Sequence, residues 1–263
     1  MIKKQVKLFY SKYPYPFQNI LSLQDLFKSK HKKVMEQILF CSTQNYESLK
    51  GIDVLDAGCG TGEKSLFLSY FGARVDAFDI SPTSISIAKK TAKKLGLRIN
   101  FFVQSFENFK ATKKYDLILA IGSLHHSANP KENFLKLSNY LKKDGVIVVG
   151  LYNLYGRFFI RIVRFLLKLI FKTPSKIVDF LLKFYKPPTK TAIVLLADKY
   201  AVPHESYHTI GEVLGWFREA NLKPLAIYPP IKLDFVSIFS WQLFSLFTKK
   251  GFFFISAKKQ KTN

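Results

Sequence analysis

Short apolar runs alternate with amphipathic stretches along the part of the chain that follows residue 50. One predicted strand ends at residue 55, and others cover residues 74–80, 99–103, 115–121 and 146–151. The segments between them repeat apolar residues at helical spacing, and the fifth run is almost wholly apolar, as in strands buried on both faces. This alternation predicts an α/β fold with a doubly wound parallel sheet.

Glycines and capping residues mark where the predicted helices of this region begin and end. Gly72 and Gly96 close the first two helices. A third helix is predicted to begin at Asn129 and to run to about residue 143, before the chain turns at Asp144.

The regular alternation stops after residue 153. Residues 222–228 and 251–257 are predicted to be strands six and seven, the last running antiparallel at the sheet edge. We therefore expect one domain with helical insertions after strand five and between strands six and seven. Its parts are an N-terminal arm and helix (1–45), a core (46–153), an insertion (154–200) and the end of the sheet (201–263) with a second insertion (231–250).

Caps also place helices in the C-terminal half. Thr173 is predicted to begin a helix of the first insertion that ends at Pro187 and Pro188. Thr209 and Glu212 form a capping box for a later helix. The last six residues are predicted to be a frayed tail.

Composition limits the compartment and the partners. The chain has 41 Lys and Arg residues against 18 Asp and Glu, a net charge of +23 that attracts nucleic acid, anionic lipid or acidic small molecules. Only six of the basic residues are arginines, so an ordinary solvated lysine-rich surface explains the charge as well as a dedicated binding surface does. Cys41 and Cys59 provide neither a disulfide framework nor a zinc pattern. The N-terminal residues do not resemble a secretory signal, and we expect a cytoplasmic protein without a bound metal.

Residues 54–62 combine an apolar run, an acidic residue and three spaced glycines, as Val-Leu-Asp-Ala-Gly-Cys-Gly-Thr-Gly. Glycines after a buried strand let the backbone approach a ligand that any Cβ would push away. In such sheets ligands bind beyond the carboxyl ends of the strands. Asp79 ends the second strand, where a carboxylate can accept hydrogen bonds from two ribose hydroxyls. No Lys-Ser/Thr pair follows the glycines, which excludes a P-loop.

Four ordered motifs resemble those of the class I S-adenosylmethionine-dependent methyltransferases. They are the glycine loop, Phe-Asp-Ile-Ser, Leu-His-His and Leu-Lys-Lys-Asp-Gly, and the resemblance covers roughly residues 51–153. Residues 198–222 resemble the C-terminal part of some small members. The resemblance implies a Rossmann-like seven-stranded sheet, S-adenosyl-L-methionine as cofactor and methyl transfer as the reaction.

The resemblance also assigns cofactor contacts. Asp56 would hydrogen-bond near the methionine amino group, Asp79 would hold the ribose, and Ile80 would pack against adenine. Ser105 and Phe106 stand where members often have an acidic residue, and backbone atoms there would substitute. Alternatively, Asp56 ties down the loop and Asp79 only closes a turn. The implied cofactor-binding residues are Asp56, Gly58, Cys59, Gly60, Asp79, Ile80, Ser105, Phe106 and Gly122.

Histidines beyond strand four and in the loop at residues 203–209 are candidate general bases. S-adenosylmethionine is already an activated methyl donor, so a base is optional. Where the acceptor is a hydroxyl or an amine, histidine is the side chain that titrates near neutrality. His126 is the first candidate, followed by His204 and His125, and a structural role is the alternative for each. Tyr13 and Tyr15 are candidates for a lid over the cofactor or for an arm packed on the core.

The sequence leaves the acceptor open. Apolar and aromatic insertions favour a small-molecule or lipid-like acceptor. The positive charge makes RNA, as in tRNA methyltransferases, the alternative, although the chain has no recognisable RNA-binding module. A non-catalytic S-adenosylmethionine-binding protein is a third class, which the intact glycine loop and Asp79 disfavour.

Five basic residues of the first insertion are spaced four, three, four and four apart, so they form one stripe of an otherwise apolar helix. Two interpretations are equal. Either the helix contacts an anionic membrane peripherally, or its apolar side covers the pocket while its basic side is solvated. The stripe consists of Arg157, Arg161, Arg164, Lys168 and Lys172.

Overall fold

The computed structural model describes residues 1–17, 20–28, 30–185, 189–248 and 250–260. Its centre is a seven-stranded sheet with the strand order β3-β2-β1-β4-β5-β7-β6. The strands are β1 (Asp53–Ala57), β2 (Arg74–Asp79), β3 (Ile99–Val103), β4 (Tyr115–Ile121), β5 (Leu141–Tyr152), β6 (Leu222–Tyr228) and β7 (Phe252–Lys259). Strand β7 runs antiparallel to both β5 and β6, while the other pairs are parallel. The predicted doubly wound sheet with an antiparallel last strand is confirmed.

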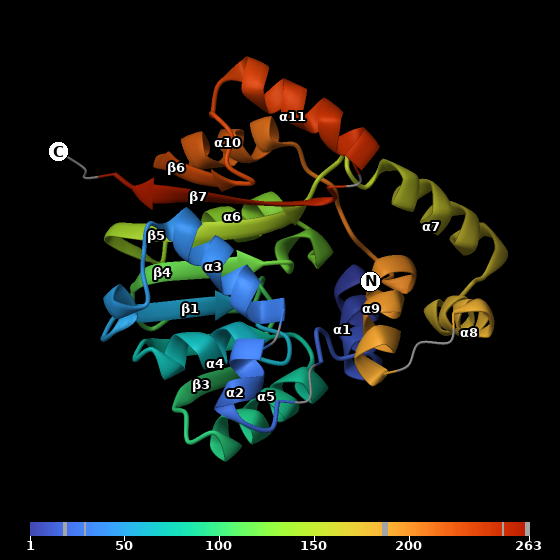
Figure 1. Ribbon diagram of the computed structural model, residues 1–263, viewed down its shortest axis with the longest axis horizontal. Coiled ribbons are helices and arrows are strands. Elements are labelled where there is room, and N and C mark those ends of the chain that lie inside the picture. Colours follow the sequence, from blue (N-terminus) through green and yellow to red (C-terminus); the bar gives the residue numbers. More distant parts are fainter. Residues whose placement is uncertain (18–19, 29, 186–188, 249, 261–263) are drawn as a thin grey trace.

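Helices surround this sheet and extend beyond one end of it (Figure 1). They are α1 (Ile2–Lys12), α2 (Leu23–Lys28), α3 (Lys30–Ser42), α4 (Glu63–Tyr70), α5 (Pro82–Lys94), α6 (Pro130–Ser138), α7 (Phe158–Ile170), α8 (Pro174–Phe184), α9 (Lys190–Ala201), α10 (Ile210–Glu219) and α11 (Phe235–Thr248). Helices α7 to α9 are the predicted insertion after strand five, and α11 is the one between strands six and seven. No helix in the described ranges is long and apolar enough to cross a membrane.

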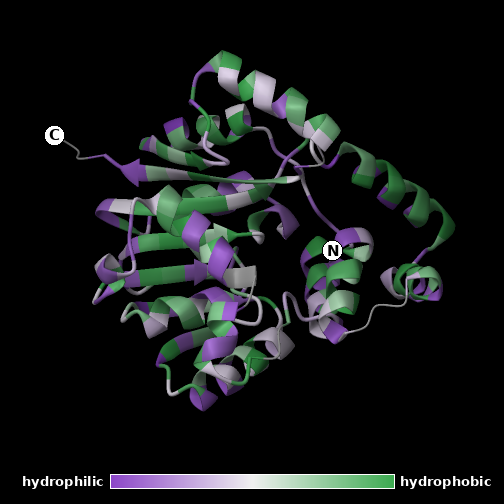
Figure 2. Ribbon diagram, viewed as in Figure 1, coloured by the Kyte–Doolittle hydropathy of each residue, from purple (hydrophilic) through white to green (hydrophobic). Residues whose placement is uncertain are grey.

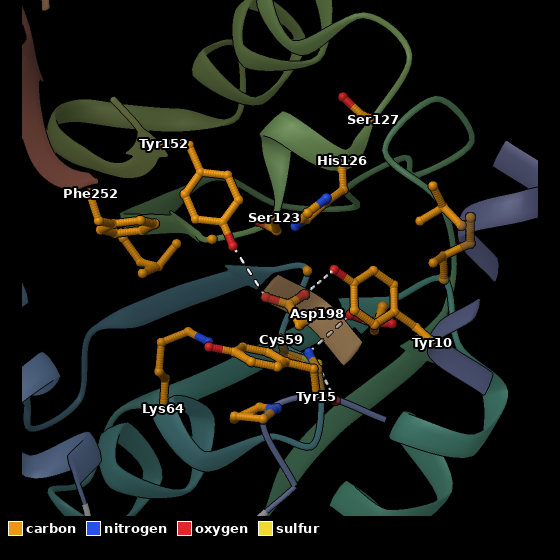
Figure 3. A pocket seen from close by; sticks show the side chains of 18 of the residues that line it. Tyr10, Tyr15, Cys59, Lys64, Ser123, His126, Ser127, Tyr152, Asp198 and Phe252 are labelled. Atoms are coloured by element: carbon orange, nitrogen blue, oxygen red, sulfur yellow. Dashed lines mark hydrogen bonds between the residues drawn. The ribbon is translucent and has the colours of Figure 1, made fainter. Parts of the chain in front are cut away.

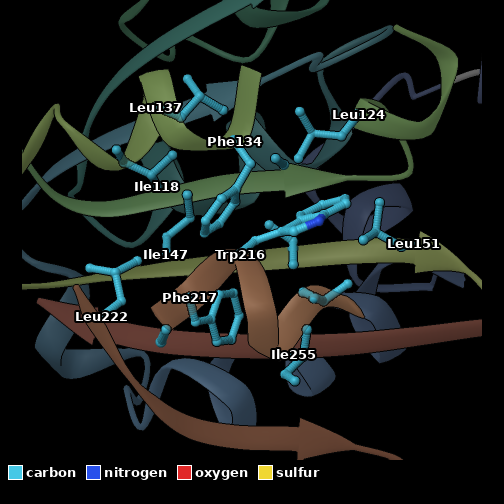
Figure 4. Packing of buried hydrophobic residues seen from close by; sticks show 14 of the residues in the cluster. Ile118, Leu124, Phe134, Leu137, Ile147, Leu151, Trp216, Phe217, Leu222 and Ile255 are labelled. Atoms are coloured by element: carbon cyan, nitrogen blue, oxygen red, sulfur yellow. The ribbon is translucent and has the colours of Figure 1, made fainter. Parts of the chain in front are cut away.

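Two hydrophobic layers hold the helices on the sheet. On one face, α3, α4 and α5 cover the strands with residues such as Met35 and Phe67. On the other face, Phe134 of α6 packs against Trp216 and Phe217 of α10, and the three rings lie over β4, β5 and β7 (Figure 4). A third cluster joins α1, α7, α8 and α9 away from the sheet. The central strands β1, β4 and β5 are therefore largely buried on both faces, which explains their continuous apolar runs.

One predicted boundary is wrong. Helix α6 ends at Ser138, five residues before the predicted end, and β5 already begins at Leu141. The sheet takes these residues because the Tyr115 N–H donates to the Tyr140 carbonyl oxygen, 2.9 Å away, and Leu141 pairs with Tyr115. Asp144 has a φ of +63°, so the predicted turn is a distortion inside a long strand.

The other C-terminal predictions have mixed outcomes. Thr173 and Thr209 cap α8 and α10 as predicted, each by accepting a hydrogen bond from a backbone N–H. The carboxylate of Glu212 bonds the His208 ring, so the capping box is not reciprocal. Lys258 and Lys259 belong to β7, so the predicted frayed tail begins later than expected. Residues 187, 188 and 261–263 lie outside the described residues.

Candidate active site

A cavity of about 800 Å³ lies beyond the carboxyl ends of the parallel strands. The loop between β1 and α4 forms one wall, and α1 and α9 close the opposite side (Figure 3). Apolar side chains dominate its lining, among them Ile80, Phe106 and Phe252. The volume is at the upper end of the range for small-molecule sites, so the cavity has room for a nucleoside-sized ligand and a second molecule.

The glycine loop is shaped by backbone conformations that other residues avoid. Gly58 and Gly60 have φ values of +75° and +58°. A Cβ on Gly58 would lie 2.3 Å from the Cβ of Ser123, and one on Gly60 would lie 2.2 Å from the Tyr15 carbonyl oxygen. Both residues line the cavity, as does Cys59 between them. Burial raises the pKa of the Cys59 thiol well above its ordinary value, so this residue packs and does not act as a nucleophile.

The N-terminal arm crosses directly over this loop. The Thr61 N–H donates to the Tyr15 carbonyl oxygen at 3.1 Å, and the Thr61 hydroxyl accepts from the Phe17 N–H at 3.1 Å. The Tyr15 side chain lines the cavity. Tyr13 instead packs against Phe9 in the outer helical cluster. Only one of the two predicted lid tyrosines therefore reaches the site.

Asp79 lies at the end of β2 and faces the cavity. One carboxylate oxygen accepts the Gly60 N–H at 2.9 Å and the other accepts the Ser81 N–H at 2.8 Å. Burial raises the pKa of Asp79, while these two backbone N–H groups oppose the rise. A carboxylate offers about four acceptor positions, so the two oxygens keep lone pairs for ligand hydroxyls.

Asp56 does not line the cavity. It is fully buried beneath the loop, where it accepts a hydrogen bond from the Ser65 hydroxyl at 2.7 Å and pairs with Lys64 at 3.8 Å. The Lys64 side chain itself lines the cavity. The Ser65 bond fits the alternative in which Asp56 ties down the loop, while its other carboxylate oxygen makes no hydrogen bond within the described residues, so the predicted cofactor contact stays a prediction.

The remaining predicted cofactor residues line the same cavity. Ile80 and Phe106 supply apolar surface, and Gly122 has a φ of +71° with open space where a Cβ would be. Ser105 also lines the cavity, and its buried hydroxyl has no hydrogen-bond partner within the described part of the chain. A buried hydroxyl without a partner is costly, which marks this position as one that a polar ligand atom would satisfy.

A polar cluster that sequence reasoning missed faces the loop across the cavity. Asp198 of α9 is buried and accepts hydrogen bonds from the hydroxyls of Tyr10 at 2.7 Å and Tyr152 at 3.2 Å. Burial, with the Asp198 charge, raises the pKa of both tyrosines well above the ordinary value, so both hydroxyls stay protonated. An aspartate within the apolar stretch of α9 was the available signal, and it takes on meaning only once α9 is placed over the site.

His126 points into the cavity between Tyr10 and Tyr152 (Figure 3). Its Nδ1 lies 2.9 Å from the carbonyl oxygen of His204. A carbonyl only accepts, so Nδ1 carries the proton and Nε2 of the neutral ring has a free lone pair. Burial lowers the pKa of His126, which favours this neutral form.

The other two candidate bases do not line the cavity. His125 is fully buried, and its ring stacks on Tyr152 at 3.9 Å between centroids. Burial lowers the pKa of His125 well below the ordinary value. His204 places its Nε2 3.1 Å from the Ser127 carbonyl oxygen, and its own backbone carbonyl orients His126. Neighbouring residues of the short helical turn at Leu124–His126 point in different directions, which explains why only one histidine reaches the site.

A buried charge cluster fixes the loop that carries His204. The carboxylate of Glu205 pairs with Arg157 at 3.4 Å and with Arg164 at 3.1 Å, and it also accepts a hydrogen bond from the Tyr207 hydroxyl. Arg157 in turn stacks over Tyr152, with its guanidinium carbon 3.6 Å from the ring centroid. Two arginines of the predicted basic stripe are therefore buried structural residues and not a solvated surface.

Residues 48–177 match the model of a family described as a methyltransferase domain. The same region carries the glycine loop, Asp79 and strands β1 to β5. The chain therefore contains a methyltransferase domain of this family, with the fold of the class I S-adenosylmethionine-dependent methyltransferases.

Sequence relatives match the central part of the chain. A ubiquinone biosynthesis O-methyltransferase of Rickettsia canadensis is 29% identical over 119 residues, which are 45% of this chain and 50% of the relative. The protein of that name from Pelagibacter ubique is 40% identical over 106 residues, 40% of this chain and 44% of the relative. The chain thus spans about half the length of the curated relatives it matches.

Solved structures resemble nearly the whole chain, in fold alone. The magnesium protoporphyrin IX methyltransferase of Synechocystis, crystallised with S-adenosylmethionine, has a TM-score of 0.61 at 13% identity, and the match covers 99% of this chain and 98% of that one.

No group of three or more His, Cys, Asp or Glu residues in the described part of the chain could hold a metal ion.

Proposed function

We propose that this protein transfers a methyl group from S-adenosylmethionine to a small, largely apolar acceptor. The observation that carries the proposal is one cavity in which a glycine loop and Asp79 face the polar cluster of Asp198 and His126. The side formed by the glycine loop and Asp79 offers hydrogen-bond acceptors and a backbone that a nucleoside can approach closely. The opposite side offers His126 as a proton acceptor and Asp198 as an anion, within apolar walls.

The residues on the loop side fit the family's cofactor. Asp79 would hold the ribose hydroxyls, the backbone of Gly58 and Gly60 would lie against the methionine part, and Ile80 and Phe106 would flank the adenine. When bound, S-adenosylmethionine supplies an activated methyl group, so the protein has to position the acceptor and exclude water.

The residues on the other side would act on the acceptor. We assign to His126 Nε2 the removal of a proton from an acceptor hydroxyl, since this atom carries a free lone pair at the cavity wall. Asp198 would position the acceptor through the hydroxyls of Tyr10 and Tyr152, which it holds in place. The sequence relatives named O-methyltransferases agree with a hydroxyl acceptor.

Binding of S-adenosylmethionine, measured by calorimetry, tests the cofactor half. Asp79→Ala should weaken binding by about 10- to 100-fold, the value of hydrogen bonds to a charged group. Asp116→Ala, at the amino end of β4, is the matched control and should bind normally. The proposal fails if native protein does not bind the cofactor, or if both variants bind as well as the native protein does.

A second experiment identifies the acceptor class. Native protein receives labelled S-adenosylmethionine and a cell extract, and the label is then sought in small molecules, lipid, RNA and protein. Label in small molecules or lipid supports the proposal, and label confined to RNA replaces it with the alternative that the net charge of +23 motivates.

A further inference from the structure

Helix α7 exposes most of its apolar side and buries Arg164, whereas an ordinary surface helix buries apolar side chains and exposes charged ones. Phe165, Leu166, Leu169 and Ile170 are 51–69% exposed. Arg157 and Arg164, on the opposite side, are no more than 7% exposed. The apolar side of α7 therefore does not cover the pocket, and the predicted solvated basic side is exposed only at Lys168 and Lys172.

The charge cluster around Glu205 explains this orientation. Arg164 pairs with Glu205 and donates to the carbonyl oxygens of Lys199 at 3.2 Å and Val202 at 2.7 Å. Breaking a buried charge pair costs several kcal/mol, so these bonds hold Arg157 and Arg164 of the basic stripe inward. The same rotation leaves the other side of α7 without a covering element among the described residues.

Helix α11 extends the apolar surface. Phe235, Val236, Phe239, Phe244 and Phe247 are each 52–82% exposed. The two helices meet end to end, because Gly156, just before α7, packs against the backbone of Lys250, just after α11. Figure 2 shows the hydrophobic colouring along α7, and Figure 1 shows α11 and α7 following one another along one edge of the molecule.

The charges around these helices indicate what covers them. Asp179 is the only acidic residue of segment 154–190, whereas the exposed basic residues that the structure describes in this segment are Lys168, Lys172, Lys176, Lys183 and Lys190. A second copy of the chain would bring another +23 toward the first, so like charges would oppose pairing. An anionic lipid surface instead offers an apolar interior for the aromatic side chains and negative headgroups for the lysines.

We propose that α7 and α11 bind the surface of an anionic membrane, with their exposed apolar sides in the lipid interface. With 13 and 14 residues, they would lie along the surface. Arg157 and Lys250, at the junction of the two helices, also line the cavity. The membrane-facing edge is thus adjacent to one wall of the site.

Co-sedimentation with lipid vesicles tests the proposal. Native protein should bind vesicles that contain phosphatidylglycerol, bind more weakly in high salt, and bind poorly to phosphatidylcholine alone. Replacing exposed side chains as L169S, I170S and F247S together should reduce the partition coefficient by about ten-fold or more, because each removes apolar area from the interface. These residues lie outside the cavity lining, so cofactor binding should be unchanged and reports correct folding.

The matched control replaces an exposed apolar side chain far from α7 and α11 with serine. Phe102 is 43% exposed on β3, at the far edge of the sheet, and F102S should bind vesicles as the native protein does. The proposal is overturned if native protein ignores anionic vesicles, if F102S loses binding equally, or if the triple substitution converts a dimer in solution into a monomer. Vesicle binding is independent of methyl transfer, so its failure leaves the proposed function intact.

Discussion

At the scale of single residues, His126 is the group on which the proposed proton transfer depends. Burial lowers the pKa of His126, and only the neutral ring has a lone pair on Nε2. The active form is therefore lost as pH falls through a pKa below 6.5. We expect kcat/KM to be level near neutrality and to decline on the acid side. Rates measured across pH, with the acceptor found in the extract, check this.

His126→Gln should lower kcat by about 100-fold or more and remove the acid limb, while S-adenosylmethionine binding stays normal. The matched control is His204→Gln, because His204 orients His126 through its backbone carbonyl, which the substitution retains. An acid limb that persists in H126Q would assign the proton transfer to another group.

Residue identity alone predicts the two halves of the site unequally. Asp79 and the glycines could be recognised because the turn after a strand requires a particular backbone geometry. That geometry depends on residues that are close together in the sequence. Asp198 could not, because its partners Tyr10 and Tyr152 lie 188 and 46 positions away. His125 and His126 are neighbours in sequence, and only the packing around Tyr152 separates their environments.

At the scale of elements, the sheet was predictable and the insertion was not. Strands β3, β4 and β6 occupy the predicted residues because apolar runs and turn residues agree there. The five-residue error at α6 arose where the sheet ladder overrides helical spacing. In α7 the basic stripe was seen correctly, but its direction depends on Glu205, which no periodicity within the helix reveals.

Glu205 should therefore control how α7 is attached. Glu205→Gln leaves Arg157 and Arg164 as buried charges without their anion, and we expect a loss of about 3–5 kcal/mol. Hydrogen exchange should accelerate in α7 and in the loop at residues 202–208 before it does in the sheet. Asp179→Asn, at an exposed position of α8, is the control and should change little. Uniform acceleration across the sheet in E205Q would contradict a local role for the cluster.

At the scale of the whole molecule, charge makes stability depend on pH in two windows. The first belongs to His125, whose burial holds its pKa well below 6.5 in the folded state. The unfolded chain therefore binds this proton more readily, and stability falls as pH drops below about 6.5.

The second window belongs to Asp53, at the opposite end of the sheet from the cavity. Hydrogen bonds from Arg74, then Lys142 and Lys113, hold the pKa of Asp53 well below 3.8.

Because the folded pKa of Asp53 is depressed, its contribution is complete above the unfolded pKa and is lost as pH falls below about 4. Asp53→Asn should cost roughly 2 kcal/mol at neutral pH, the value of hydrogen bonds to a charged group. The difference from native protein should begin to shrink in urea titrations near pH 3, because Asp53 of the unfolded chain takes up a proton there while the native carboxylate is still ionised. Glu219→Gln removes a pair whose side chains are half exposed, and serves as the control with little effect at either pH. A D53N deficit that stays constant with pH would show that the ion cluster acts through packing and not through charge.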